Sequence, residues 1–478
     1  MRIGQTSFIF FVSKLVASLL GFVATIYFAR TLGPDVLGYY ALVVSLVAWI
    51  ELGGRSFSTA VKKRISEATD PNQYFTAGGI TLVFVGSLGI LLILVFQTQI
   101  NNYVGENVAL FAAALLVANL IYVFVSAVLE GERQVHISGI LVPLRTGIRS
   151  AVQIFLVLYG FQLVGMLAGY LIAGIATGII GFAYISSKFE IPKKRHFKSM
   201  YNYAKFSWLG TLKARTYNDV DIIVLGALTS STFVGIYSVA WGISKFMAVF
   251  DSSLRSALFP EISKAKVEND EQIAGKLVSD SLRYSGFVSI PGLFGGMVLG
   301  DQILQIYGPE FVQGTTVLSL LILATVIYGY QTQLTNAIDA LDRPKISFNI
   351  NIVFILTNVV LNVLLIPIVG WAGAAAATVL SASLGVVLAF QALTNLLEFG
   401  VPINEIVYQV GSGLLMSVVV IALQDVLVTT HIVDRPTGRL VILIIAGALV
   451  YFLTLLAISR DFRKTVDSNL PFKVPFVH

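Results

Sequence analysis

The sequence contains no cysteine and few charged residues, and each of these features excludes some classes of protein or site. Without a cysteine among 478 residues, disulfides, thiolate metal sites and cysteine nucleophiles are all excluded. Only 12% of the residues are charged, whereas soluble proteins carry roughly 25%. Hydrophobic residues make up 56% and the mean hydropathy is +0.83. This composition excludes an ordinary soluble protein and places the chain in a bilayer.

Long apolar stretches predict an all-α polytopic membrane protein with about fourteen transmembrane helices, because one helical span needs roughly 20 apolar residues. We place the spans at 7–29, 36–57, 75–97, 108–129, 139–159, 163–186, 201–227, 232–258, 281–300, 315–339, 345–366, 372–394, 405–424 and 439–459. The first stretch is long enough to span and no small-residue cleavage site follows it. We therefore expect a retained helix and not a signal peptide.

The first twelve spans divide into two halves with a weak internal repeat. The sequence VLGYYAL at 36–42 resembles FVGIYSV at 233–239, an offset of 197 residues that pairs Gly38 with Gly235. Chance similarity between aromatic, glycine-rich loops is the alternative. We predict two parallel six-helix lobes, at 1–186 and 201–394, joined by a basic cytoplasmic linker at 187–200. Residues 395–478 then supply two additional helices and a cytoplasmic tail.

The distribution of Lys and Arg predicts the topology. The connections after spans 3, 5, 7, 9 and 11 contain neither residue, whereas those after spans 2, 4, 6, 8 and 10 do. Positive loops stay in the cytoplasm, so both termini are expected there, in a multi-pass protein of the cell membrane. The loop at 395–404 has no basic residue and gives no support to this assignment.

Charges inside the spans carry the most information, since each costs about 2.5 to 3.5 kcal/mol at a helix centre. Three opposite-charge pairs are spaced four residues apart and can neutralise themselves on one helix face. They are Glu51 with Arg55, Arg215 with Asp219, and Asp251 with Arg255. These pairs predict a structural role.

Four cations have no opposite charge one turn away: Lys14, Arg149, Lys213 and Lys245. We expect them to face a wet interior, although snorkelling to an interface along their aliphatic stems is the alternative. Arg145 lies one turn from Arg149, and Arg215 lies two residues from Lys213. A cavity that these six side chains line would bind phosphate, because guanidinium and ammonium groups both recognise it.

Other polar residues in the spans are candidates for sugar contacts or for ion coupling. Amide side chains near the cations can bind sugar hydroxyls, although hydrogen bonds between helices are the alternative. They are Asn119, Gln153, Asn218, Gln331, Gln333, Asn336 and Asn358. Asp219 and Asp221 are candidate proton or sodium sites, with pairing to Arg215 or Lys213 as the structural alternative.

No enzymatic pattern is present in the sequence. The four histidines have no metal-ligand spacing, and no phosphate-binding Gly-Lys-Ser/Thr motif occurs. We therefore expect no catalytic residue, no metal and no cofactor. The basic residues follow membrane topology, so nucleic acid is not an expected partner.

Several segments resemble oligosaccharide flippases of the polysaccharide transporter family, within the multidrug/oligosaccharidyl-lipid/polysaccharide exporter superfamily. ARTLGPDVLGYY at 29–40 is similar to that family's first-loop signature. Further similar segments follow in the expected order across the first twelve spans: DIIVLG at 221–226, LFPEIS at 258–263 and GWAGAA at 370–375. Gly53 and Gly54 depart mildly from the pattern after Glu51.

The resemblance implies a flippase that moves a sugar or oligosaccharide linked to polyprenyl or dolichyl (pyro)phosphate across the membrane. Transport is by alternating access between two lobes around a cationic cavity. It serves protein glycosylation or surface polysaccharide assembly, with membrane lipid, glycosyltransferases, a polymerase or an oligosaccharyltransferase as expected partners. The alternatives are a multidrug or metabolite exporter of the same superfamily, or a non-transporting scaffold of a glycan assembly complex.

Overall fold

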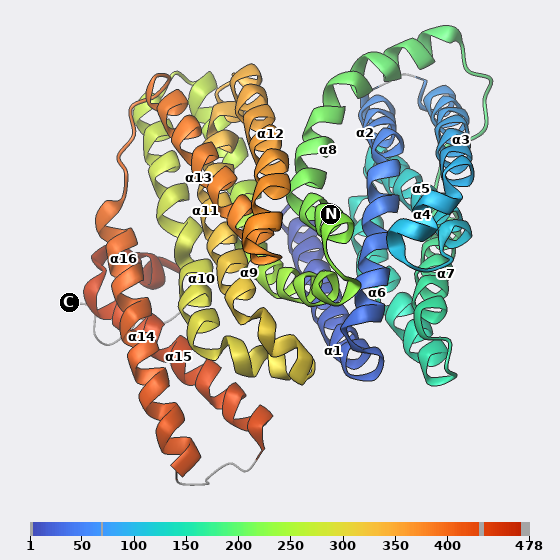
Figure 1. Ribbon diagram of the computed structural model, residues 1–478. Coiled ribbons are helices and arrows are strands. Elements are labelled where there is room, and N and C mark those ends of the chain that lie inside the picture. The colour runs from blue at the N-terminus through green and yellow to red at the C-terminus, as the bar shows by residue number, and fades with distance from the viewer. Residues whose placement is uncertain (1–2, 68–69, 430–434, 470–478) are drawn as a thin grey trace. The chain divides into compact units, whose positions relative to one another are not determined.

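The computed structural model describes residues 3–67, 70–429 and 435–469, and the side chains of these residues apart from 3–15, 206 and 465–469 (Figure 1). Within these ranges the chain forms helices and no strand. The helices are α1 (Ile3–Ile50), α2 (Leu52–Glu67), α3 (Pro71–Val95), α4 (Gln97–Val104), α5 (Ala109–Gly131), α6 (Val135–Leu158), α7 (Gln162–Phe182), α8 (Lys194–Leu228), α9 (Ser231–Val267), α10 (Glu271–Gln305), the 3₁₀ helix η1 (Pro309–Gly314), α11 (Thr315–Ala340), α12 (Pro344–Val369), α13 (Ala372–Thr394), α14 (Ile403–Thr429), α15 (Pro436–Ile458) and α16 (Arg460–Asn469).

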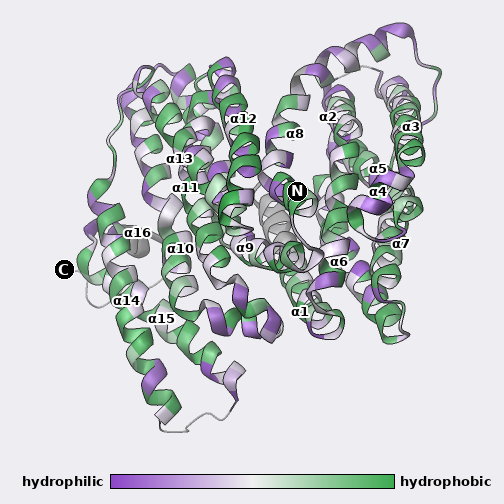
Figure 2. Ribbon diagram, in the orientation of Figure 1, coloured by the Kyte–Doolittle hydropathy of each residue, from purple (hydrophilic) through white to green (hydrophobic). Residues whose placement is uncertain are grey.

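Twelve helices of the described residues are long and apolar enough to cross a membrane. In Figure 2 their apolar residues run along the ribbons, whereas the N-terminal part of α8 is polar. The number differs from fourteen for two reasons. The element α1 counts once although its two helical segments, which meet at Gly33, cover two predicted spans. The helix α8, which carries five charged residues between 205 and 221, is not among the twelve. The all-α membrane class is confirmed, and the count of fourteen stays a prediction.

The helices form two compact units, which we describe separately. The first comprises Met1–Val239 and Asn362–Pro367, and the second comprises Ala240–Leu361 and Ile368–His478. In the first unit α6 packs against α1 and α7, and α2 packs against α5 and α8. In the second unit α11 packs against α10 and α13, and the α14–α15 hairpin packs against α10. The predicted boundaries of the two lobes and the linker stay predictions.

A glycine bends α1 where the two predicted spans meet. Gly33 has φ 76° and ψ 177°, a left-handed conformation that favours glycine, and Pro34 follows it. Gly33 therefore separates two helical segments of α1, at the segment that carries the family signature.

The two copies of the short repeat contact each other in the first unit. A Cβ at Gly38 would collide with the main-chain carbonyl of Ser231, and a Cβ at Gly235 would collide with that of Pro34. Ser231 follows Pro34 by 197 residues, the offset that also relates Gly235 to Gly38. The two contacts are thus reciprocal, as expected when related segments pack across a local two-fold axis.

The segment between α7 and α8 is tied to neighbouring helices by hydrogen bonds from its backbone. The amide of Ser187 donates to Glu132 Oε1 at 2.7 Å, and the amide of Lys188 donates to Asn72 Oδ1 at 2.9 Å. These contacts fix the entry to α8 against the first turn of α3 and the α5–α6 turn.

A buried histidine completes this attachment. His196 Nδ1 accepts a hydrogen bond from the Lys193 amide at 2.9 Å, so Nε2 carries the ring proton and donates to Asp70 Oδ2 at 2.9 Å. Arg195 also pairs with Asp70 Oδ2, at 2.6 Å. The hydrogen bonds from His196 and Arg195 hold the pKa of the Asp70 carboxyl below its usual value.

Candidate functional site

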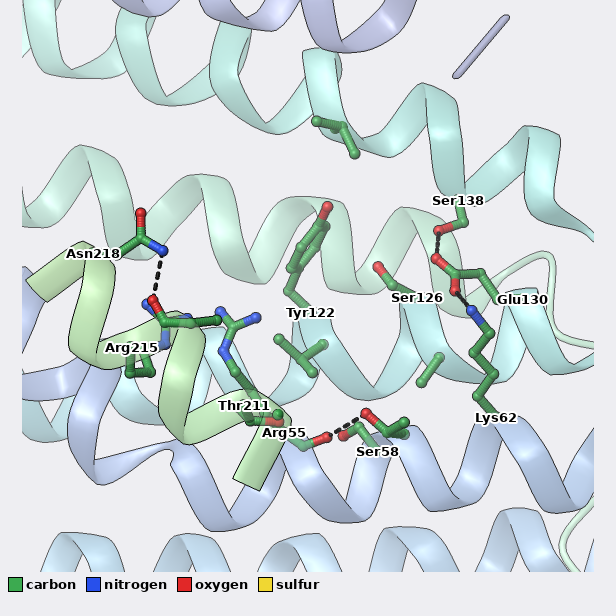
Figure 3. Close-up of a pocket in the computed structure, with 16 residues that line it drawn as sticks. Arg55, Ser58, Lys62, Tyr122, Ser126, Glu130, Ser138, Thr211, Arg215 and Asn218 are labelled. Carbon is green, nitrogen blue, oxygen red and sulfur yellow. Dashed lines mark hydrogen bonds and ion pairs between the residues drawn. The ribbon is translucent and has the colours of Figure 1, made fainter. Parts of the chain in front are cut away.

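The first unit contains a polar cavity of about 780 Å³ between α2, α5, α6 and α8. Figure 3 shows two clusters of side chains in it. Arg55, Thr211, Arg215 and Asn218 lie toward one end, and Lys62, Ser126, Glu130 and Ser138 lie toward the other. Tyr122 stands between them. The lining is rich in hydroxyl groups and includes the Asn218 amide, which suits a polyhydroxylated ligand.

At the first end, one buried carboxylate is shared by two arginines. Glu51 is 1% exposed, and its Oε1 accepts from Arg55 Nε and, at 3.3 Å, from an Arg215 terminal nitrogen. Arg215 donates a further hydrogen bond to Asp219 Oδ2 at 3.0 Å. Because Glu51 lies behind the arginines, their remaining N–H groups are the ones available to the cavity.

At the other end the charges are also matched. Lys62 pairs with Glu130 at 2.5 Å, and Ser138 donates to the same carboxylate at 3.0 Å. The buried Ser126 hydroxyl has no hydrogen-bond partner among the residues that the structure describes. Across both ends, three cations face three carboxylates, so the cavity carries hydrogen-bonding groups without a large net charge.

Two arginines of α6 lie beside this cavity on aromatic rings. The Arg145 guanidinium lies 4.1 Å from the centroid of the Tyr122 ring and donates to Asn119 Oδ1. It also lies 5.2 Å from the Tyr170 ring, and Arg149 lies 5.5 Å from the same ring. In the described part of the chain neither arginine forms an ion pair with a carboxylate. Arg145 and Arg149 therefore place two positive charges without a carboxylate partner next to Tyr122, which also lines the cavity.

A second, smaller cavity of about 230 Å³ lies at Arg149. Asp219 and Gln153 line it as well. Because Asp219 also holds Arg215, the ion-pair network connects the walls of the two cavities.

The structure brings together three of the six predicted substrate-binding residues. Arg145, Arg149 and Arg215 lie at or beside the two cavities. Lys213 is on α8 in the same unit but lines neither cavity. Lys245 is in the second unit, where its ammonium lies 5.0 Å from the Trp241 ring. The Lys14 side chain lies outside the described residues.

The two candidate ion-coupling aspartates have different surroundings. Asp219 pairs with Arg215, which is the structural alternative noted above. Asp221 is buried and accepts hydrogen bonds from the Tyr237 hydroxyl at 2.5 Å and from Asn362 Nδ2 at 2.8 Å. Their role in ion coupling stays a prediction.

The predicted in-span pairs form in two cases of three. Glu51 pairs with Arg55, and Arg215 pairs with Asp219. The expected pairing of Asp251 with Arg255 is wrong, since the described residues contain no ion pair between them. Asp251 instead accepts a hydrogen bond from Ser285, because helix packing offers it a partner on α10.

Sequence reasoning missed part of the cavity lining. Lys62 lies in a connection whose basic residues indicate only membrane topology, and the spacing of Glu51 and Arg55 indicates only a pair within one helix. Tyr122 and Tyr170 gave no signal, because single tyrosines in spans are common. Of the predicted amide residues, Asn218 lines the larger cavity and Gln153 the smaller one, while Asn358 bonds to Thr378 and Ser381 on α13. Within the described residues, no cluster of three His, Cys, Asp or Glu side chains could hold a metal ion.

Solved structures of two exporters share this fold. The lipid II flippase MurJ in an inward closed conformation has a TM-score of 0.78 at 17% identity, covering 95% of this chain and 99% of that one. An inward-facing multidrug resistance MATE family transporter has a TM-score of 0.68 at 14% identity, covering 79% of this chain and 95% of that one. The chain therefore has the two-lobe fold of these exporters.

Sequence comparisons then define the family. The model described as polysaccharide biosynthesis protein matches residues 3–266, and the MatE model matches residues 212–364. A protein named "Probable flippase AglR" from Haloferax volcanii is 30% identical over 98% of both chains. A probable low-salt glycan biosynthesis flippase of the same organism is 28% identical over 99% of this chain and 100% of that one. This chain belongs to the polysaccharide biosynthesis protein family and is a multi-pass membrane protein.

Proposed function

We propose that this protein is a flippase for a lipid-linked glycan. Its substrate is a sugar or oligosaccharide on polyprenyl or dolichyl (pyro)phosphate. The protein moves this substrate from the cytoplasmic to the outer leaflet. The observation that carries the proposal is the pair Arg145 and Arg149, two cations without a carboxylate partner in the described residues, beside a hydroxyl-rich cavity. The names of the two relatives, both flippases, support it.

In this proposal the phosphate binds at Arg145 and Arg149. Guanidinium groups offer planar, charge-assisted hydrogen bonds to phosphate oxygens. The carrier phosphate supplies the negative charge that no carboxylate of the described residues supplies to these two arginines. Tyr170, in contact with both, holds the guanidinium groups by cation–π attraction.

The glycan then occupies the cavity of about 780 Å³. Its paired charges neither attract nor repel a neutral sugar, but they still offer N–H donors and oxygen acceptors to hydroxyl groups. The unpartnered Ser126 hydroxyl supplies another such group. Tyr122 lines the cavity and also contacts Arg145. A phosphate at the arginines and the sugar attached to that phosphate can therefore bind at the same time.

Transport follows the alternating-access scheme of the superfamily, with the lipid tail in the bilayer and both termini in the cytoplasm. With the cytoplasm negative, outward movement of one negative charge is favoured by about 2.3 kcal/mol per 100 mV. Enzymes of the same pathway, namely glycosyltransferases, a polymerase or an oligosaccharyltransferase, are the proposed partners.

A reconstitution assay tests the proposal. Lipid-linked glycan that accumulates in cells lacking the protein is incorporated into vesicles with the purified full-length chain, and a lectin outside reports the glycan that becomes accessible. We expect accessibility to rise with wild-type protein and not in protein-free vesicles. Equal accessibility in both would contradict the flippase assignment.

A blocking substitution tests the glycan cavity separately. Gly210 lines the cavity, and a Cβ there would meet no atom within 4 Å, so Gly210→Phe fills space without a backbone clash. We expect transport of the glycan-bearing lipid to fall about tenfold while binding of bare polyprenyl phosphate persists. Gly411→Phe on α14 is the matched control, since a Cβ there is equally free. Equal transport by both variants would exclude this cavity as the glycan site.

The MatE match and the MATE neighbour favour a second candidate, an exporter of drugs or metabolites. A cavity for cationic cargo needs an acidic or aromatic lining without excess positive charge, and the Arg145–Arg149 pair disfavours it. Efflux of a fluorescent organic cation by the same vesicles, without glycan transport, would establish this alternative. A scaffold would show neither activity.

A further inference from the structure

The connection between α7 and α8, residues 183–193, lies where two candidate spans leave the membrane. It follows the end of α7 and runs beside the start of α3, and both helices are long and apolar enough to cross a bilayer. The Lys188 amide donates to Asn72 Oδ1 at 2.9 Å. One turn further along α3, Thr76 Oγ1 accepts from the Glu190 amide at 3.0 Å. In Figure 1 the first part of α8 continues from this connection across the ends of α2 and α3.

Two apolar side chains of this connection are exposed. Phe189 is 77% exposed and Ile191 is 87% exposed. The Phe189 ring lies 5.2 Å from the Phe75 ring, measured between centroids, which fixes its level at the second turn of α3. Exposed aromatic and aliphatic groups beside the end of a span are stable at the boundary between lipid headgroups and acyl chains. These two side chains therefore favour contact with lipid over contact with water.

Positive charges surround these apolar side chains. Glu190 is the only acidic residue in the sequence between 183 and 198. Arg195 is engaged by Asp70 at 2.6 Å. Four further cations are exposed and form no ion pair with a carboxylate among the described residues, namely Lys188, Lys193, Lys194 and Lys198. The surface therefore carries positive charge that the described part of the protein does not neutralise.

The opposite face of the first turns of α8 is already occupied. His196, Met200 and Ala204 follow one another at a spacing of four residues, and all three are buried. Met200 and Ala204 pack in an apolar cluster with residues of α2, α3 and α5. His196 is bonded to Asp70, which precedes α3. The lysines are therefore presented on a fixed support, and their face is the one open to a partner.

We propose that residues 188–198 form a binding surface for anionic phospholipids of the surrounding bilayer. The four lysines bind the headgroups, and Phe189 and Ile191 enter the acyl boundary beneath them. Basic clusters next to a span attract anionic lipids, whereas a zwitterionic lipid brings no net charge to neutralise the lysines. Because α8 continues to the polar cavity, where it supplies Thr211 and Arg215, bound lipid stabilises the start of a helix of the candidate site. The proposal stands independently of the transported substrate.

A fluorescent label at residue 191 measures which lipid lies at this surface. The sequence has no cysteine, so Ile191→Cys allows a single bimane label to be attached there. The labelled full-length protein is reconstituted in vesicles of equal parts phosphatidylglycerol and phosphatidylcholine, with bromine on the acyl chains of one lipid or the other. We expect brominated phosphatidylglycerol to quench the label at least about fivefold more strongly than brominated phosphatidylcholine. Iodide in the water should quench it less than either lipid.

Charge variants decide whether the lysines select the lipid. Replacing all four lysines, as Lys188→Gln/Lys193→Gln/Lys194→Gln/Lys198→Gln, should bring the ratio of the two quenching constants to about one. The matched control removes the same charge from exposed cations of the second unit, as Lys264→Gln/Lys276→Gln/Arg343→Gln/Lys345→Gln, and should keep the original ratio. High salt tests the same charges without substituting them, since a Debye length of about 3 Å at about 1 M should also lower the ratio.

Three results would overturn the proposal. A label quenched by iodide and by neither brominated lipid would place residue 191 in water and leave this face to a soluble partner. Equal quenching by the two lipids with all four lysines present would exclude selection of anionic headgroups. A ratio that survives both the four glutamine substitutions and high salt would assign the selection to other residues. Since no transported glycan enters these measurements, their failure is distinct from failure of the flippase assay.

Discussion

At the residue scale, Glu51 is the most constrained charge of the candidate site. It is shared by arginines of α2 and α8 and is almost wholly buried. Hydrogen bonds to charged groups contribute about 1.5 to 3 kcal/mol, and breaking a buried pair leaves the remaining charges without a partner. The residue therefore determines both local stability and the orientation of Arg55 and Arg215.

We expect Glu51→Gln to lower the free energy of unfolding by about 2 kcal/mol, because an amide cannot neutralise the two arginines. The thermal midpoint in detergent measures this. Glu67→Gln removes an exposed partner of Lys63 and should change stability by less than about 1 kcal/mol. Equal midpoints for the two variants would contradict the shared-carboxylate account.

Sequence spacing predicts only those contacts that lie within one helix. The pairs of Glu51 with Arg55 and of Arg215 with Asp219 follow from a spacing of four residues. The bond between Glu51 and Arg215 joins residues 164 positions apart and depends on how α2 packs on α8. The same limit explains why the predicted pairing of Asp251 with Arg255 is wrong, since the hydrogen-bond partner of Asp251, Ser285, lies on another helix.

At the scale of elements, close helix approach depends on two glycines. Gly38 and Gly235 each lie against the backbone of the other repeat segment, and backbone cannot move aside as a flexible side chain can. Their reciprocal contact makes the two positions equivalent.

We expect Gly38→Ala and Gly235→Ala to destabilise the protein by about 1 to 3 kcal/mol each, the range for overpacking. Gly210→Ala should instead be neutral or stabilise by up to about 1 kcal/mol, because its Cβ is free and alanine favours a helix. Thermal midpoints of the three variants test this difference in sign. A stabilised Gly38→Ala would show that the helices do not approach as described.

The attachment of α8 to α3 through Asp70 should depend on pH. The pKa of Asp70 is lowered in the folded protein, so its contribution is fully present above the unfolded value near 3.9 and is lost as pH falls through the lower folded value. We expect faster proteolysis of residues 183–193 below about pH 4. An acid-stable protease measures it.

Asp70→Asn is the control for this pH dependence. It should give faster cleavage at neutral pH and remove the acid transition assigned to Asp70. A wild-type transition that persists in Asp70→Asn would assign it to another group.

At the scale of the whole molecule, composition and periodicity are sufficient for the class. Apolar stretches predict the helices that the structure contains, because a bilayer imposes length and hydropathy on each span. The break between the first two predicted spans falls at Gly33 and Pro34, residues that interrupt a helix, and Gly33 is the non-helical residue there. The cavity could not be predicted, because its lining comes from four helices and includes charges that look self-compensating in sequence.

The central claim is that cations without carboxylate partners receive the anionic headgroup, and Arg145 and Arg149 test it most directly. The measurement is the initial rate at which lipid-linked glycan becomes accessible to external lectin in vesicles containing Arg145→Gln/Arg149→Gln. Arg435→Gln/Arg439→Gln, with the same spacing at the start of α15, is the control. We expect a rate at least about tenfold slower for the α6 variant, with an unchanged thermal midpoint, and a wild-type rate for the control. A wild-type rate for Arg145→Gln/Arg149→Gln would contradict it.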